Sequence, residues 1–150
     1  AKRAYHHTAP VNALYALHES LVMLREEGLE NAWKRHAFQH SALKAGLEAM
    51  GISFVVKEAD RLPQLNTVFI PDGVDDALLR ARLLSEYNLE IGAGLGALAG
   101  KVWRIGLMGN SAHSEKVIFC LSALEAILSD MGAPIKKGVA LSAAQSVYSA

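Results

Sequence analysis

Apolar residues recur along this chain at the three- and four-residue spacing that is typical of amphipathic helices. Leucines at positions 14, 17, 21 and 24 predict a helix over residues 12–27, with Asn12 as its N-cap and Gly28 as its C-cap. The same reasoning predicts further helices from Asn31 to Gly51, from Asp75 or Asp76 to Tyr87, and from about Ser114 to Met131.

Strands are predicted where short runs are rich in β-branched and aromatic residues, at positions 52–57, 66–70 and 102–107. In the third strand, alternation places Trp103 and Ile105 on one face and Arg104 on the other. Too few strands alternate with helices to build a doubly wound sheet. The predicted fold class is therefore α+β, with a small, mostly antiparallel sheet and helices packed on one of its faces.

The chain has 150 residues, of which 51% are apolar, so we expect one domain whose core needs no metal or disulfide. We assign residues 1–132 to this domain. Residues 133–150 are rich in Ala and Ser without a firm apolar pattern, which predicts a mobile tail. The chain does not begin with Met, and its first residues are typical of a mid-chain loop, so we expect a fragment of a longer protein.

Charge and cysteine content argue against several function classes. Lys plus Arg and Asp plus Glu are equal at 15 each, which gives no electrostatic support for binding to nucleic acid or to a membrane surface. No apolar stretch approaches the ~20 residues that span a bilayer. Cys120 is the one cysteine, so we expect no disulfide framework and predict a reducing, cytoplasmic location.

Several chemical motifs are matched only weakly. Residues 92–97 fit the loose Gly-x-Gly-x-x-Ala pattern of dinucleotide sites, but a loop and a strand follow where such a site needs a helix N-terminus. His36 and His40 would share a helix face, yet no third metal ligand is evident, which favours a polar helix face and no metal site. Cys120 has apolar neighbours and no base nearby in sequence, so we interpret it as a packing residue.

Arg104 is the strongest candidate for a binding residue. Its strand face must accommodate a guanidinium, and Gly106 on the same face leaves room for a planar anion. Because arginine binds carboxylates through two parallel hydrogen bonds, one interpretation is a carboxylate clamp. The other is an ordinary strand arginine paired with a surface acid, and the pattern alone favours this second interpretation.

The segment Tyr5-His6-His7-Thr8 offers a phenol, two imidazoles and a hydroxyl just before the first predicted helix. Such donors ahead of a helix N-terminus suit a phosphate or another anion. By composition alone, an ordinary polar loop in which Thr8 caps the helix is the better supported interpretation.

An ordered series of motifs runs through about residues 5–132: Tyr5-His6-His7-Thr8-Ala9-Pro10-Val11, Leu14-Tyr15-Ala16-Leu17, Glu26-Glu27-Gly28-Leu29-Glu30-Asn31, Glu90-Ile91, Gly94-Leu95-Gly96, Gly100-Lys101-Val102 and Arg104-Ile105-Gly106-Leu107. This series resembles the C-terminal domain of the alanine–glyoxylate (serine–pyruvate) aminotransferases, which are class V, fold-type I pyridoxal-phosphate enzymes. An ordered series of separate matches is more specific than any single motif.

The resemblance implies roles for individual residues. Arg104 matches the arginine that binds the substrate α-carboxylate. Tyr5 and Thr8, in an arm at residues 1–11, match residues that reach the cofactor phosphate of the other subunit, and His6 and His7 would have a supporting part. The family's Schiff-base lysine belongs to the large domain, and no lysine of this chain matches its motif, so no catalytic residue is assigned here.

The resemblance thus implies a homodimeric enzyme that uses pyridoxal 5'-phosphate. It would move an amino group from a small amino acid, with alanine, serine and ureidoglycine all open, to glyoxylate or a pyruvate-like 2-oxo acid. Its partners would be a large domain of the same polypeptide and a second subunit, and we expect the isolated chain to be inactive. The alternative is a free-standing α+β module that binds a carboxylate or mediates dimerisation without catalysis.

Overall fold

The computed structural model describes residues 6–150, and Tyr5 therefore lies outside the described residues. The chain separates into two compact units, Ala1–Lys34 and Arg35–Ala150. This division falls inside the segment that the sequence analysis assigns to one domain, within the second predicted helix. Within residues 6–150, no helix is long and apolar enough to cross a membrane.

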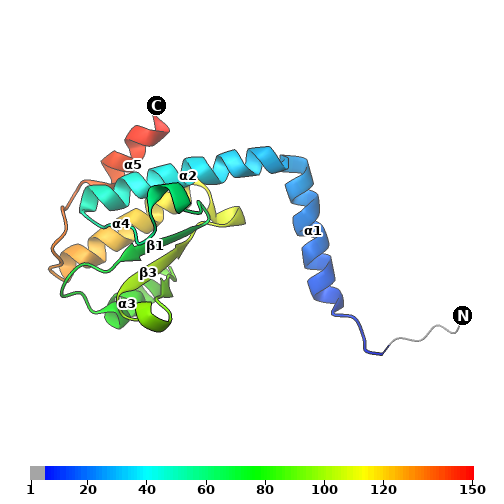
Figure 1. Cartoon of the computed structure of the whole chain (residues 1–150), viewed down its shortest axis with the longest axis horizontal. Coiled ribbons are helices and arrows are strands. Elements are labelled where there is room, and N and C mark those ends of the chain that lie inside the picture. The colour runs from blue at the N-terminus through cyan, green and yellow to red at the C-terminus, as the bar shows by residue number, and fades with distance from the viewer. Residues whose placement is uncertain (1–5) are drawn as a thin grey trace, which may run out of the picture. The chain divides into compact units, whose positions relative to one another are not determined.

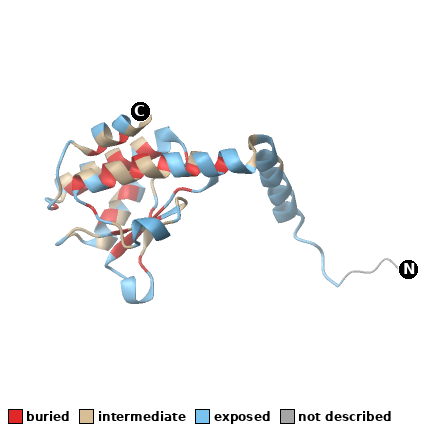
Figure 2. Cartoon of the chain, turned by 45° about the horizontal axis from the view of Figure 1, so that its top comes forward, coloured by how far each residue is buried: buried red, intermediate tan, exposed pale blue. Residues whose placement is uncertain are grey.

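In the first unit, helix α1 (Val11–Glu27) follows the predicted leucine pattern. It ends as expected at Gly28, which has a left-handed φ of 85° and donates its N–H to the Leu24 oxygen at 2.9 Å. Its start differs from the prediction, because Pro10 rather than Asn12 occupies the N-cap position and no side chain caps the helix. None of the α1 residues is buried, and Figure 2 shows the helix exposed along its length.

Helix α2 (Leu29–Met50) begins before the predicted cap, because Asn31 lies inside the helix and donates its side-chain amide to the Glu27 oxygen at 2.9 Å. It ends at Gly51, whose φ of 92° is the left-handed conformation that glycine adopts readily. In the second unit this helix contributes buried apolar side chains to the core: Ala42, Leu43, Leu47 and Met50.

The second unit is built on a three-stranded antiparallel sheet (Figure 1). Its strands, in spatial order, are β1 (Leu65–Phe69), β3 (Val102–Gly106) and β2 (Gly92–Ala93). In this register Arg104 of β3 lies opposite Thr67 of β1 on one side and opposite Gly92 of β2 on the other. Arg104 is therefore central in the sheet.

The strand predicted over residues 52–57 is much shorter than expected. Only Phe54 forms a β-bridge, to Val68 of β1. The chain then leaves the sheet through the short 3-10 helix η1 (Glu58–Asp60), and the Arg61 guanidinium lies 4.3 Å from the centre of the Phe54 ring. Two backbone hydrogen bonds flank the Phe54 bridge, from the Val55 N–H to the Thr67 oxygen at 3.0 Å and from the Phe69 N–H to the Ser53 oxygen at 2.9 Å, so the segment pairs with the edge of β1 only briefly.

Three longer helices complete the second unit: α3 (Asp76–Tyr87), α4 (Ser114–Asp130) and α5 (Ala140–Tyr148). The termini of α3 are as predicted, since the Asp75 carboxylate accepts the Leu78 N–H at 2.9 Å and Asn88 ends the helix with a φ of 51°. Helix α5 corrects the prediction of a tail without regular structure. Its Ala140 and Ala144 are fully buried against the core.

The core lies on one side of the sheet. Val68, Trp103 and Ile105 are buried there with side chains from α2 to α5, and Figure 2 shows the buried positions gathered in this unit. On the opposite face Phe69 is exposed and Arg104 is half-buried. The α+β class, with helices packed on one face of a small antiparallel sheet, is confirmed.

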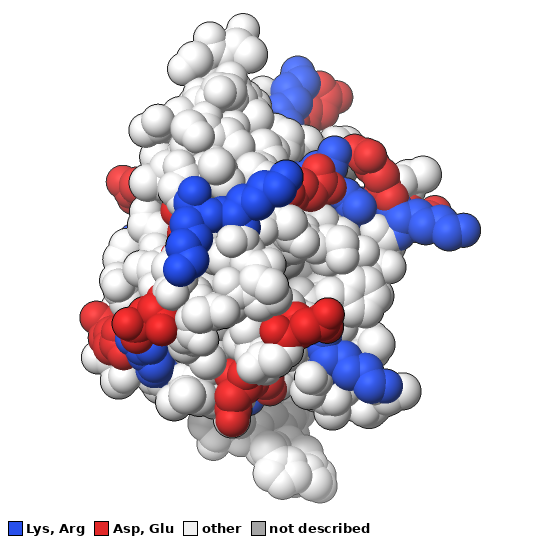
Figure 3. All heavy atoms as spheres, turned by 90° about the vertical axis from the view of Figure 1, so that its left-hand side faces the viewer, with Lys and Arg blue, Asp and Glu red and all other residues white. Residues whose placement is uncertain are grey.

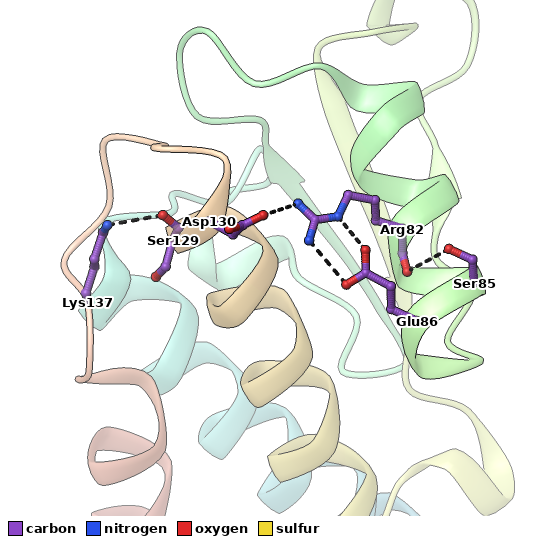
Figure 4. Close-up of polar contacts among 6 residues, drawn as sticks. All are labelled: Arg82, Ser85, Glu86, Ser129, Asp130 and Lys137. Carbon is purple, nitrogen blue, oxygen red and sulfur yellow. Dashed lines mark hydrogen bonds and ion pairs between the residues drawn. The ribbon is translucent and has the colours of Figure 1, made fainter.

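Several charged side chains of the second unit form ion pairs at its surface. Arg82 of α3 forms ion pairs of 2.6 Å with both Glu86 and Asp130, and the second pair ties α3 to α4 (Figure 4). On the face shown in Figure 3, basic and acidic residues lie next to one another. Exposed pairs of this kind contribute at most ~1 kcal/mol each, so the fold depends mainly on its apolar core.

Candidate functional site

Arg104 occupies the middle strand of the sheet. Its neighbours Trp103 and Ile105 are buried in the core, as the alternation predicts, whereas Arg104 points to the opposite face and is half-buried. Directly opposed residues of an antiparallel pair share a face, so Thr67 and Gly92 flank the arginine. The sheet thus presents one guanidinium on the face that the helices leave uncovered.

The guanidinium of Arg104 is bonded to the backbone of β2. Its Nε donates to the Ala93 oxygen at 2.7 Å. Within residues 6–150 no carboxylate forms an ion pair with Arg104, whereas Arg80 and Arg82 both pair with acidic side chains. The interpretation of Arg104 as an ordinary arginine paired with a surface acid therefore lacks its acid in the described part of the chain.

The space beside the guanidinium is set by Gly92. A Cβ at position 92 would lie 3.3 Å from Nη2 and 3.4 Å from Nε of Arg104. A Cβ at position 106 would have only the Met108 Cε nearby, at 3.4 Å, and no atom of Arg104 within 4 Å. Strand pairing thus brings Gly92, and not Gly106, directly against the guanidinium. The room for an anion beside Gly106 stays a prediction.

The glycine-rich segment at residues 92–100 is a tight connection between strands. It contains β2, the 3-10 helix η2 (Gly96–Leu98) and a turn into β3. Gly94 packs so closely that a side chain there would collide with the Leu98 carbonyl oxygen. No α-helix begins at this segment, and the predicted tight loop is found after Ala93, whereas Gly92 and Ala93 form the unpredicted strand β2.

The two residues matched to cofactor binding belong to the first unit. Tyr5 lies outside the described residues, and Thr8 is exposed shortly before α1 begins. Thr8 does not cap α1, because Pro10 is the N-cap and no side chain makes a capping bond. The binding of a phosphate by Tyr5 and Thr8 stays a prediction.

His36 and His40 of α2 have separate hydrogen-bond partners. His36 is buried, and its Nε2 accepts the Gly109 N–H, at the 3-10 helix η3 (Gly109–Ser111), at 3.0 Å. His40 Nδ1 lies 2.6 Å from Oδ1 of Asn66, which is buried in β1. The predicted polar helix face is thus wrong for His36, which serves as a satisfied buried polar group. In residues 6–150 no three His, Cys, Asp or Glu side chains group as metal ligands would.

Cys120 is a packing residue, as predicted. It is buried in α4, and burial raises the pKa of its thiol to about 12. A thiol with this pKa carries almost no thiolate at neutral pH, so it is not an activated nucleophile.

The comparisons with known proteins cover nearly the whole chain. No protein-family model matches it. It is 43% identical over 147 residues to (S)-ureidoglycine–glyoxylate transaminase of Bacillus subtilis, with 98% of this chain and 35% of that protein aligned. It is 44% identical over 127 residues to alanine–glyoxylate aminotransferase of Callithrix jacchus, with 84% of this chain and 31% of that protein aligned.

The fold is shared as well. The crystal structure of ureidoglycine–glyoxylate aminotransferase from Bacillus subtilis superposes with a TM-score of 0.92 at 43% identity, covering 97% of this chain and 38% of that one. The chain therefore spans about a third of the length of the curated relatives it matches. Over that third, it is homologous to aminotransferases of the alanine–glyoxylate and ureidoglycine–glyoxylate type.

Proposed function

We propose that this chain is the C-terminal small domain of a pyridoxal-phosphate aminotransferase, in which Arg104 binds the substrate carboxylate. The enzyme moves an amino group from a small amino acid, such as alanine or serine, to glyoxylate or a pyruvate-like 2-oxo acid. The observation that carries this proposal is the guanidinium of Arg104, which stands on the uncovered sheet face without an acidic partner in residues 6–150. The homology to aminotransferases supplies the reaction class.

Arg104 acts on both substrates in turn, because the amino donor and the 2-oxo acid each carry a carboxylate next to the reacting carbon. Two charge-assisted hydrogen bonds fix the plane of that carboxylate. The fixed plane limits rotation of the α-carbon, so the C–H bond that must be broken is held in one orientation. The contribution of this chain to catalysis is therefore substrate orientation.

The residues around the start of α1 fit the phosphate end of the cofactor. The helix N-terminus has no side-chain cap, and the exposed Thr8 hydroxyl makes no capping bond. Uncapped backbone N–H groups and a hydroxyl are the donors that phosphate groups accept. In the proposed dimer, Thr8 and Tyr5 would hold the phosphate of the cofactor bound to the other subunit. When bound, the cofactor supplies an electron sink for the α-carbon of the substrate.

The exposed apolar stripe of α1 supports the presence of a partner surface. Leu14, Leu17 and Leu21 lie at helical spacing and are all more than half exposed, at 51%, 55% and 56%. A contiguous apolar stripe of this kind marks a surface that packs against another domain or subunit. We assign it to the large domain of the same polypeptide and to the dimer contact.

The test is the substitution Arg104→Ala in the intact enzyme. The loss of two charge-assisted hydrogen bonds should raise KM for the amino donor and for the 2-oxo acid at least ~30-fold. Affinity for pyridoxal phosphate should change less than ~3-fold, because Arg104 does not bind the cofactor. Arg104→Lys is the matched control, since it keeps the charge but loses the planar fork and should recover only part of the affinity.

Equal losses of substrate and cofactor affinity in Arg104→Ala would contradict the assignment. The purified 150-residue chain offers a second test, because no lysine in it matches the Schiff-base position. With added pyridoxal phosphate it should show no transamination of alanine or serine with glyoxylate, and measurable turnover would contradict the proposal.

A further inference from the structure

The geometry at β2 assigns a further positioning residue, Gly92, to the carboxylate site, an inference that rests on the proposed role of Arg104. We propose that Gly92, by carrying no side chain, lets the guanidinium lie flat against β2 and thereby sets the affinity for substrate carboxylates. Gly92 and Arg104 are directly paired across two strands, so any side chain at position 92 would share the face of the guanidinium.

The bond to β2 decides which edge of the guanidinium is available. An arginine offers carboxylates either the edge formed by Nε and one terminal nitrogen or the edge formed by Nη1 and Nη2. In Arg104 the Nε–H already donates to the Ala93 oxygen at 2.7 Å. The first edge thus faces β2, and a substrate carboxylate binds end-on, through Nη1 and Nη2.

Gly92 lies against the same edge that faces β2. The Cβ of an alanine at position 92 would stand 3.3 Å from Nη2 and 3.4 Å from both Nε and Cβ of Arg104. The distance to Nη2 is tighter than an ordinary van der Waals contact, and the two distances of 3.4 Å lie at the lower limit of such contacts. The guanidinium would therefore shift away from β2 by a few tenths of an ångström. This shift would lengthen the hydrogen bond to Ala93 and reorient Nη1 and Nη2, which bind the substrate carboxylate.

The backbone at Gly92 does not itself require glycine. Gly92 is absent from the glycines with positive φ, so an alanine there meets no backbone strain. The absence of a side chain at this position therefore matters for the neighbouring guanidinium and not for the turn. This separates a role in substrate positioning from a role in folding.

The experiment compares three variants of the intact holoenzyme: Gly92→Ala, Gly92→Val and Gly106→Ala. We expect KM for glyoxylate and for the amino donor to rise ~3- to 10-fold in Gly92→Ala and further in Gly92→Val, with kcat within ~2-fold of the parent value. Gly106→Ala places the same methyl on the same face of β3, with no Arg104 atom within 4 Å, and should leave KM within ~2-fold. Calorimetric titration with propanoate should show the same order of affinities without turnover.

Two results would overturn the role of Gly92. One is an equal KM in Gly92→Ala and Gly106→Ala, and the other is a fall in kcat of Gly92→Ala at unchanged KM. The midpoint of thermal unfolding is measured for each variant, and a KM that rises only in step with loss of folded protein would also overturn it. Arg104→Ala separates the two proposals. If that variant keeps the parent KM, the proposed function itself fails, whereas if it loses substrate affinity while Gly92→Val does not, only the positioning role fails.

Discussion

Helices α1 and α4 have the same length and the same kind of apolar stripe, yet only one of them packs. Each is 17 residues long. In α4 the stripe residues Leu121 and Leu124 are 0% and 1% exposed, whereas in α1 Leu17 and Leu21 are 55% and 56% exposed. The difference shows that helical spacing of leucines predicts a helix and its apolar face but not the surface that covers that face.

The largest expected effect on stability distinguishes the buried stripe of α4 from the exposed stripe of α1. Leu124→Ala removes a fully buried side chain from the core and should destabilise the 150-residue chain by ~2–5 kcal/mol. Leu17→Ala, its matched control, removes an exposed side chain and should change stability by less than ~0.5 kcal/mol. Urea unfolding followed by circular dichroism measures both.

The intact protein sharpens this comparison. On the proposed function, α1 packs there against a partner surface, so Leu17→Ala should cost ~1–3 kcal/mol or weaken the proposed dimer correspondingly. A loss of the same small size in the intact protein as in the 150-residue chain would show that the α1 stripe has no partner.

A second prediction concerns the hydrogen bonds by which Asp76 of α3 is joined to Trp103 of β3. The Asp76 carboxylate accepts hydrogen bonds from Arg80 Nε at 2.8 Å and from Trp103 Nε1 at 3.0 Å. The bond from Arg80, opposed by partial burial and helped by the charge of Arg80 and by Trp103, lowers the pKa of Asp76 below its ordinary value. Because the folded state favours the ionised form, Asp76 stabilises the fold above the ordinary pKa and ceases to do so as the pH falls through the lowered pKa.

Asp76→Asn should therefore destabilise the chain by ~1–2 kcal/mol at pH 7, where the charged hydrogen bonds are intact in the parent. The difference between parent and variant should shrink progressively as the pH falls below ~4. Unfolding in urea at pH 7, 5 and 3 measures this trend. A difference that is as large at pH 3 as at pH 7 would contradict the role of the ionised carboxylate.

The smallest expected effect on stability comes from substitutions at the N-termini of α3 and α1. Asp75 caps α3, since its carboxylate accepts the Leu78 N–H at 2.9 Å, so Asp75→Ala should cost ~1 kcal/mol. Asn12 makes no capping bond in α1, so Asn12→Ala should cost less than ~0.3 kcal/mol or slightly stabilise the helix. Thermal unfolding distinguishes the two, and a larger loss for Asn12→Ala would place the helix start where the sequence predicted it.

Sequence patterns predicted most of the elements of this fold. Regular leucine spacing identified α1, α3 and α4, and the turn residues Gly28 and Asn88 ended helices where expected. Helix α5 escaped prediction because its buried positions are alanines, Ala140 and Ala144, which do not stand out in an Ala- and Ser-rich segment. Residues 52–57 pair over a shorter stretch than predicted because composition favours extended backbone but does not fix how many residues pair.

The site was predictable only in part. Alternation along β3 placed Arg104 opposite the core, as found. The residues that surround its guanidinium, Gly92 and Ala93, come from another strand, and no pattern within β3 indicates the register that brings them there. The sequence therefore predicted the sheet face on which Arg104 lies but not the neighbours of its guanidinium, because those are fixed by long-range pairing.

The mass of the intact protein in its source cells tests the central claim most directly. The account predicts a polypeptide well above 16.1 kDa, the mass of this chain, that yields, after borohydride reduction, a peptide with a pyridoxal-modified lysine from outside these 150 residues. A product of about the mass of this chain, with no cofactor-modified lysine, would contradict the aminotransferase assignment and would favour a carboxylate-binding module.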